Sequence, residues 1–448
     1  MYDQRVRSDL ASCLAGAFLS GVWDETGLLT RASVAIDPTP RWASSLALQV
    51  LRAYLRAPLD RARELESFIE LVLKDLPTDP EETRQPLILR WSSPEPAMAR
   101  RRWPVPEIET EAALAEFLEL SDGALAWMAD ALCLERTTGE LPLRHYLYRT
   151  MPRRGGAVRV IERPKQRLKA LQRRILHEIL DLVPTHEAAH GFTRGRSVGS
   201  HASTHVGQFA VVRFDLKDFF ASIAAGRIYG IFRTAGYPES VAHSLTALTT
   251  NVVPAAVWHA IPRPAEARLI PLHHQLGQRL AAPHLPQGAP TSPALANLAA
   301  FRLDRRLSGL ATALGLRYSR YADDLTFSGS VRLVRSMPTL QEAVVAIARD
   351  EGFAINPDKT YLATRAGRQR VCGVVVNERT NLAREEYDTL KAILHNAKLS
   401  GPAAQNRHGH SDFRAHLLGR IAWLHSLNPG RGEKLRAQFE QIVWLAAP

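Results

Sequence analysis

The chain has 448 residues, of which 46% are hydrophobic and 23% are charged. These values lie near the averages for a globular protein, and the length allows two or three domains with separate cores. The three cysteines, Cys13, Cys133 and Cys372, lie far apart and form no CxxC pair. This spacing argues against a zinc site and a disulfide framework, and it predicts a reducing, cytoplasmic compartment.

Charge divides the chain into two parts. Residues 1–140 contain 15 Lys/Arg and 23 Asp/Glu, a net charge of −8, whereas residues 141–448 carry a net charge of +20. A polyanionic partner is therefore expected to bind the last two-thirds of the chain. The alternative is a basic surface that is only solvated, and the motifs in the same region argue against it.

Residues 1–140 are predicted to form an acidic, mostly helical N-terminal region. The apolar run 10–23 is too short to span a bilayer and Asp9 interrupts its basic flank, so we expect a buried helix rather than a signal peptide. Apolar residues recur at helical spacing in 66–76 and 111–132. This region contains no catalytic pattern, and it either docks a partner protein or braces the rest of the chain.

The pattern changes near residue 141. Residues 152–180 predict a Gly-containing turn, a short strand and a basic amphipathic helix. Strands and helices then alternate, and 209–216 and 317–329 are the clearest strands. Residues 383–448 return to a helical pattern.

Three carboxylates stand out within this second part. Asp215 ends the apolar run FAVVRFDL, and a carboxylate leaving a buried strand is costly unless it meets a metal ion or an arginine. The segment RYSRYADDLTFSG predicts a β-hairpin with Asp323 and Asp324 at its tip. A tight turn is what aims both side chains into one site, since strand neighbours otherwise point to opposite faces. The ordinary alternative is a solvated hairpin tip.

Three carboxylates in one place repel one another and raise each other's pKa unless divalent ions neutralise them. Magnesium prefers oxygen ligands and is typically held by a few carboxylates together with substrate phosphates. Two such ions, roughly 3.5–4 Å apart, would clamp an in-line phosphoryl displacement. The predicted cofactor is therefore a pair of Mg²⁺ ions held by Asp215, Asp323 and Asp324, with Mn²⁺ as a substitute.

The succession of motifs resembles that of reverse transcriptases over about residues 150–380, roughly half of the chain. Five segments carry the likeness, in the family's order: Asp215-x4-Phe220 for the first catalytic motif, LPQGAPTSP (285–293), Tyr321-Ala322-Asp323-Asp324 for the YxDD signature, GFAINPDKT (352–360) with its lysine, and VCGVVVN (371–377) for the hairpin that grips the primer end.

The resemblance implies an α+β fold, the right-hand polymerase, in which the palm is built on an antiparallel sheet. The implied domains are the acidic helical N-terminal region (1–140), the fingers and palm (141–382) and the helical thumb (383–448). The implied activity is RNA-directed DNA polymerisation. Two alternatives are another bacterial reverse transcriptase, such as a group II intron-like enzyme, and a non-polymerising RNA-binding protein with this fold. The three retained carboxylates argue against the latter.

Within the family, AHGFTRGRSVGSHASTHVG (189–207) is most similar to bacterial retron reverse transcriptases. Their Asn-Ala-x-x-His pattern occurs here with His201 in place of the asparagine, and their Val-Thr-Gly occurs with Cys372 in place of the threonine. The resemblance implies a structured non-coding RNA as template and primer, priming from a guanosine 2′-hydroxyl, dNTPs as substrates and an RNA–DNA hybrid product. It also implies an effector protein as a partner and a role in antiphage defence, and it implies no binding to a membrane.

The resemblance also assigns roles to individual residues. Lys359 would protonate the leaving pyrophosphate as a general acid. A ring at Phe220 would collide with a ribose 2′-hydroxyl and so select deoxynucleotides, unless it is simply a core phenylalanine. The expected nucleotide-binding residues are Arg159, Lys165, Phe220, Gln287 and Gly288, with Arg163 as a competing candidate; the expected RNA-binding residues are Arg194, Arg196 and His205.

Overall fold

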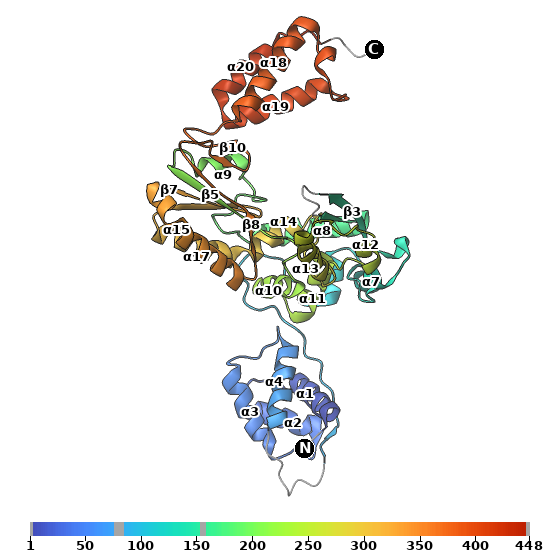
Figure 1. The fold of residues 1–448 in the computed structure, drawn as a ribbon. Helices are drawn as coiled ribbons and strands as arrows, with labels where there is room; N and C mark the ends of the chain where they lie inside the picture. Colours follow the sequence, from blue (N-terminus) through green and yellow to red (C-terminus); the bar gives the residue numbers. More distant parts are fainter. Residues whose placement is uncertain (1–2, 76–84, 153–157, 445–448) are drawn as a thin grey trace. The chain divides into compact units, whose positions relative to one another are not determined.

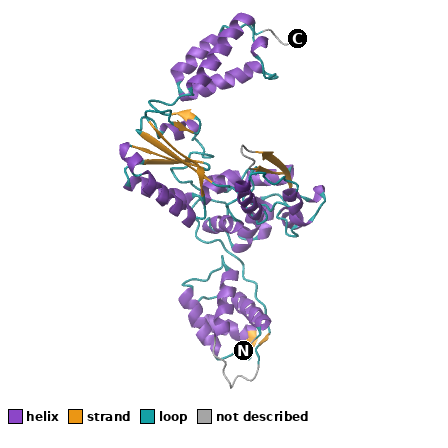
Figure 2. Ribbon diagram, viewed as in Figure 1, coloured by secondary structure: helices purple, strands orange, loops and turns teal. Residues whose placement is uncertain are grey.

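The computed structural model describes residues 3–75, 85–152 and 158–444, which form two compact units (Figure 1). The first unit comprises residues 1–183 and 224–292, and the second comprises residues 184–223 and 293–448. Helices make up most of both units, and the largest sheet belongs to the second (Figure 2). The glycine turn expected near residue 155 lies outside the described residues.

The first unit begins with a helical bundle. Its helices are α1 (Gln4–Leu19), α2 (Glu25–Ala35), α3 (Trp42–Ala53) and α4 (Ala62–Asp75). The side chains of Asp3 and Asp24 accept hydrogen bonds from backbone N–H groups and so cap the N-termini of α1 and α2. Leu14 and Phe18 lie fully buried in the bundle core, so the helix predicted for the apolar run is confirmed as far as Leu19. No helix in the described ranges is long and apolar enough to cross a membrane.

The rest of the first unit contains a two-stranded hairpin and several helices. Strand β3 (Tyr146–Pro152) pairs antiparallel with β4 (Val158–Pro164), which leads into the amphipathic α8 (Gln166–Glu178), so the predicted strand and basic helix are confirmed. The short antiparallel pair of β1 (Ile36–Asp37) and β2 (Leu87–Ile88) packs with the N-terminal bundle. The other elements of the unit are α5 (Glu111–Phe117), α6 (Asp122–Met128), α7 (Leu134–Thr137), α10 (Ala225–Thr234), α11 (Glu239–Thr249), α12 (Ala255–His259) and α13 (Ile270–Leu280).

The second unit contains an antiparallel four-stranded sheet in the order β6-β7-β5-β8. Its strands are β5 (Ala210–Leu216), β6 (Arg317–Tyr321), β7 (Asp324–Gly329) and β8 (Ile355–Thr364). Both strands that the sequence predicted are present, and the second is the expected hairpin β6–β7. Helices α15 (Phe301–Ala313) and α17 (Met337–Asp350) pack together, and α15 also contacts β6 (Figure 1).

The second unit ends in a helical bundle, as the C-terminal pattern predicted. Helices α18 (Arg384–Ser400), α19 (Phe413–Leu427) and α20 (Pro429–Glu440) share an apolar core that also contains Val371 and Val374. These two valines pair with each other in a short hairpin of β9 (Arg370–Val371) and β10 (Val374–Val375). The remaining elements are α9 (Val198–Ser203), α14 (Ser292–Ala299) and α16 (Val331–Arg335).

Candidate active site

Strand pairing brings the three aspartates together. Asp215, near the end of β5, lies directly opposite Asp324, the first residue of β7. The backbone N–H of Leu216 donates to the carbonyl of Asp323 at 2.8 Å, which fixes the turn against the end of β5. The predicted convergence of Asp215 with the Asp323-Asp324 turn therefore follows from the register of two adjacent strands.

The turn between β6 and β7 contains only Ala322 and Asp323, because Tyr321 pairs with Asp324. Ala322 has a φ of 55°, a left-handed conformation that residues other than glycine seldom adopt. The segment at Gly191 packs tightly on this turn, since a Cβ at that glycine would lie 2.6 Å from the Ala322 nitrogen. Tight packing thus holds the strained turn in place.

A buried ion pair supports the same turn from behind. Arg320 and Asp304 are both fully buried, with Nε and Nη2 of the arginine 2.8 and 2.7 Å from the two carboxylate oxygens. The remaining Nη1 group donates to Asn297 Oδ1 at 3.1 Å and to the Ala322 carbonyl at 3.0 Å. A planar guanidinium that donates from all three of its nitrogens in this way holds the turn as well as α15, the helix that carries Asp304.

Two of the three aspartates have a cationic partner. Lys359 on β8 places Nζ 3.0 and 2.9 Å from the two oxygens of Asp215. Arg213 on β5 donates to Asp324 from Nε, at 3.0 Å from Oδ2, and from Nη2. The sequence predicted a metal ion or an arginine as the partner of Asp215, and it did not identify Lys359 in this position.

Asp323 differs from its neighbours, because it makes no ion pair with any described residue. Burial, followed by the nearby charge of Asp215, raises the pKa of Asp323, so the bare site disfavours its charged form. A set of oxygen donors with one uncompensated carboxylate fits a hard divalent cation such as Mg²⁺. The donor chemistry is therefore that of a site for a divalent metal ion, while the predicted Mg²⁺ and the number of ions stay predictions.

A chain of buried histidines and hydroxyls lies beneath the hairpin. Ser319 Oγ is 2.7 Å from His201 Nδ1 and 2.8 Å from His205 Nε2, and His205 Nδ1 is 2.7 Å from Ser328 Oγ. Burial lowers the pKa of His201 to about 2 and that of His205 to about 3, with the neighbouring histidines as the next cause, so both rings are neutral.

This burial corrects one predicted binding residue. His205 was expected to contact RNA, but its side chain is fully buried and both ring nitrogens are bonded to serine hydroxyls within the sheet. The histidine therefore braces the β6–β7 hairpin. Sequence alone could not separate these roles, because both serines lie more than a hundred residues away along the chain.

Three other predicted residues lie in the second unit. Phe220 is half-buried, and its ring lies 6.2 Å from that of Phe192 and 5.6 Å from that of Phe219. Arg194 is exposed. Arg196 is half-buried and donates to the carbonyls of Glu187 and Ala189, so part of its donor capacity stabilises the loop.

The predicted nucleotide-binding residues of the first unit cluster around β4. The backbone carbonyl of Gln287 accepts a hydrogen bond from the backbone N–H of Glu162 at 2.9 Å. Lys165 donates to the carbonyls of Leu141 and Pro142, and Arg159 has a buried Nε with no hydrogen-bond partner among the described residues.

The structure gives a second reason for glycine at position 288. Gly288 has a φ of 136°, and a Cβ there would lie 2.8 Å from the Glu162 carbonyl oxygen. The sequence predicted Gly288 as a nucleotide-binding residue, and within this unit its missing Cβ also allows the close approach of β4. Beside this contact, the fully buried Glu162 accepts hydrogen bonds from His284 at 3.0 Å and from Asn251 at 2.8 Å, a network that no sequence pattern predicted.

Comparisons with known proteins agree with these motifs. Residues 151–390, which include all three aspartates, match the family model for reverse transcriptase (RNA-dependent DNA polymerase). The chain is 40% identical over 334 residues to the retron Mx65 reverse transcriptase of Myxococcus xanthus, covering 75% of this chain and 72% of that protein. It is 37% identical over 350 residues to the retron Mx162 reverse transcriptase of the same organism, covering 75% and 67%.

Among solved structures, the chain is similar to a foamy viral protease-reverse transcriptase dRH in complex with ds DNA. The TM-score is 0.36 at 14% sequence identity, with 88% of this chain and 55% of that chain covered.

Proposed function

The chain belongs to the reverse transcriptase family, and within that family to the retron type, so it catalyses RNA-directed DNA polymerisation. We propose that it copies a structured non-coding RNA into DNA by two-metal nucleotidyl transfer. The observation that carries the proposal is the meeting of Asp215, Asp323 and Asp324 at adjacent strand ends. Members of this family generally use divalent metal ions, and we propose that such ions bind to these three carboxylates.

We assign the metal ligands as follows. Asp215 and Asp323 are the main ligands, and Asp324, held by Arg213 on the neighbouring strand, has the more restrained carboxylate. Bound Mg²⁺ would lower the pKa of the attacking hydroxyl and stabilise the leaving pyrophosphate. The protein supplies the fixed geometry: the strand register sets the spacing of the carboxylates, and Arg320 holds the turn that carries Asp323.

Substrate contacts complete the proposal. We place Phe220 beside the sugar of the incoming nucleotide, where its ring, packed against Phe192, excludes a 2′-hydroxyl. Lys359, whose ammonium lies against Asp215, would be the group that gives a proton to the leaving pyrophosphate. The residues proposed to contact the nucleotide are Arg159, Lys165, Gln287 and Gly288, and those proposed to contact RNA are Arg194 and Arg196.

The retron relatives support a more specific template. We propose that this enzyme, too, uses a structured RNA as both template and primer and begins synthesis from an RNA 2′-hydroxyl. The net charge of +20 on residues 141–448 suits such a polyanion. Sequencing the nucleic acid that copurifies with the protein tests this: one structured RNA joined to DNA is expected, and bulk cellular RNA would contradict it.

The N-terminal region is proposed to serve a different partner. Residues 1–140 carry a net charge of −8, which disfavours nucleic acid and suits a protein effector acting in antiphage defence. Capturing the full chain from its host tests this idea. A stoichiometric second protein that binds the complete chain but not one with neutralised N-terminal acidic residues is expected.

Replacing Asp323 by asparagine tests the central mechanism. Primer extension on an RNA template with dNTPs and Mg²⁺ should fall roughly a hundredfold to a thousandfold, because metal stabilisation contributes several kcal/mol and about 1.4 kcal/mol is tenfold. Asp350→Asn, on the exposed end of α17, is the matched control and should retain synthesis. Undiminished synthesis by Asp323→Asn would sink the proposal.

A further inference from the structure

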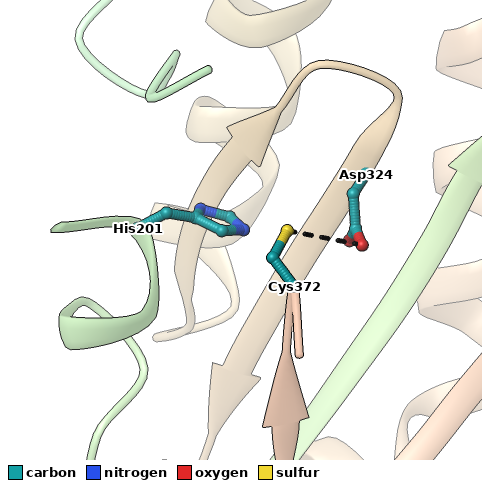
Figure 3. A group of neighbouring side chains, drawn as sticks. All are labelled: His201, Asp324 and Cys372. Atoms are coloured by element: carbon teal, nitrogen blue, oxygen red, sulfur yellow. Dashed lines mark hydrogen bonds between the residues drawn. The ribbon is translucent and has the colours of Figure 1, made fainter. Parts of the chain in front are cut away.

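Three side chains of different chemistry meet beside the polymerase carboxylates. His201 on α9, Asp324 on β7 and Cys372 in the β9–β10 turn each offer a ligand atom, and these atoms all lie within 4.8 Å of one another (Figure 3). The histidine is buried and the other two residues are half-buried. We propose that His201, Asp324 and Cys372 form a second metal site, selective for Zn²⁺, whose occupation withdraws Asp324 from the polymerase centre.

The histidine is oriented as a metal ligand requires. His201 Nδ1 lies 2.7 Å from Ser319 Oγ, and an N–H at this nitrogen leaves the lone pair of Nε2 free on the side of Asp324. The nearest hydroxyl to Nε2, that of Thr326 at 3.4 Å, already donates to Asp324 Oδ1 at 3.1 Å. A ligand histidine whose other ring nitrogen bonds to an acceptor is the usual arrangement in metal sites.

The cysteine is placed by its backbone. Val371 pairs with Val374, so the β9–β10 hairpin turns through Cys372 and Gly373, with φ values of 46° and 87°. Two consecutive positive φ values are typical of the tight turn that suits a two-residue hairpin. From this turn the sulfur points toward Asp324, with Sγ 3.8 Å from Oδ2 (Figure 3).

The donor set discriminates between metals. One nitrogen, one oxygen and one sulfur suit Zn²⁺, whereas Mg²⁺ prefers oxygen ligands alone. Zinc bonds of about 2.0–2.3 Å place tetrahedral ligand atoms roughly 3.3–3.8 Å apart, so the present cluster needs to contract by about 1 Å. Three protein ligands leave the fourth position for water. The sequence argued against zinc because it contains no CxxC pair, but these ligands come from three separate segments.

Zinc must displace a proton from Cys372, because burial and the charge of Asp324 raise the pKa of this thiol. On binding, the Cys372 thiol releases its proton to solvent, and the thiolate and the Asp324 carboxylate together neutralise Zn²⁺. Arg213 then loses part of its pairing with Asp324, because that carboxylate is shared with the metal. This competition weakens the site, so we expect binding that responds to the zinc concentration rather than permanent occupation.

The link to activity rests on the proposed catalytic role of Asp324. A carboxylate drawn toward Cys372 is no longer available at the end of β5, where it faces Asp215. Zinc should therefore inhibit DNA synthesis in a way that additional Mg²⁺ does not fully reverse, since Mg²⁺ competes for Asp324 but not for the nitrogen of His201 or the sulfur of Cys372. The binding itself does not depend on the polymerase mechanism and can be measured alone.

Binding of Co²⁺ and Zn²⁺ to the full chain tests the site. Cobalt bound through Cys372 should give a thiolate-to-metal absorption band that one equivalent of Zn²⁺ removes. Cys372→Thr should abolish the band, and His201→Asn should weaken Co²⁺ binding about a hundredfold while the protein stays folded. The matched control is Cys133→Ser, which changes an exposed cysteine and should keep the band. No band in the unaltered chain, or unchanged binding in His201→Asn, would overturn the proposal.

Primer extension with added Zn²⁺ tests the link to synthesis. Each variant is compared with its own zinc-free rate, and Cys372→Thr should need at least about tenfold more zinc than the unaltered chain for half-inhibition. If zinc fills the thiolate site and synthesis continues unchanged, the inhibitory link is wrong. This result differs from a failure of the proposed polymerase mechanism, which would show as active Asp323→Asn in the absence of zinc.

Discussion

Lys359 on β8 donates hydrogen bonds to both carboxylate oxygens of Asp215 on the paired strand β5, with Nζ 3.0 and 2.9 Å from the two oxygens. The lysine side chain is 48% exposed, so solvent weakens this pair. Its position matters more than its strength, because the ammonium occupies the side of Asp215 that the proposed mechanism gives to a divalent ion. If the proposed mechanism holds, lysine and metal compete for one carboxylate, and Lys359 is released when the metal binds.

Lys359→Gln should separate these two roles. The rate of DNA synthesis should fall roughly a hundredfold, because a general acid contributes about 10²–10⁴-fold. The Mg²⁺ concentration for half-maximal rate should fall as well, since the competing ammonium is gone. Primer-extension rates measured across a Mg²⁺ titration give both numbers. An unchanged rate together with an unchanged Mg²⁺ requirement would mean that Lys359 has neither role.

Asp323→Asn should stabilise the metal-free protein at neutral pH. Burial and Asp215 raise the pKa of Asp323 above its usual 3.8, so between that value and the raised one the folded state binds a proton that the unfolded state has lost. Stability contributed by this group therefore falls as the pH rises through that window. The neutral asparagine avoids the loss, and a gain of about 1 kcal/mol would raise the Tm by roughly 2–4 °C.

Thermal unfolding in EDTA at several pH values measures this effect. The difference between Asp323→Asn and the unaltered chain should disappear near pH 3, where both side chains are neutral. Adding Mg²⁺ at neutral pH should also reduce the difference in Tm, because the ion stabilises only the unaltered chain, which keeps all three carboxylates. A variant less stable than the unaltered chain at pH 7 would show that Asp323 is not electrostatically strained.

Local sequence was sufficient for the main strands and for the turn at Ala322 and Asp323. The apolar runs predicted β5 and the β6–β7 hairpin, and the position of Asp215 at a strand end followed directly. The partners of buried polar groups were not predictable in this way. Glu162 and His284 are separated by 122 residues, and His205 lies as far from its serines, so only the tertiary fold shows that these side chains satisfy one another. Hydrophobic periodicity identifies apolar faces and contains no information about which buried polar residues pair.

Arg320→Met should destabilise the protein by about 3–5 kcal/mol, because it leaves the fully buried carboxylate of Asp304 without its partner. It should also slow DNA synthesis, since the arginine holds the Ala322 carbonyl of the catalytic turn. Denaturant unfolding measures the first effect. The control is Arg305→Met on the exposed side of α15, the helix that carries Asp304, and its stability is expected to lie within about 0.5 kcal/mol of the unaltered chain.

The double change Arg320→Met with Asp304→Leu distinguishes a lost charge pair from lost packing. Removing both charges should recover much of the stability, because the desolvation of an unpaired carboxylate disappears. Synthesis should stay slow, since the Ala322 carbonyl still lacks its donor. If the double variant is as unstable as Arg320→Met alone, the cost arises from packing and the charge argument fails.

Gly288→Ala should damage the first unit through a backbone clash. The added Cβ would lie 2.8 Å from the Glu162 carbonyl oxygen at a φ of 136°, so β4 and the 287–288 segment must move apart. The expected loss is about 1–3 kcal/mol of stability, together with slower DNA synthesis. Gly230→Ala in α10 is the matched control, because nothing lies near its Cβ and alanine favours helix. Equal stability of the two variants would show that the segment tolerates displacement and that Gly288 is required only at the nucleotide.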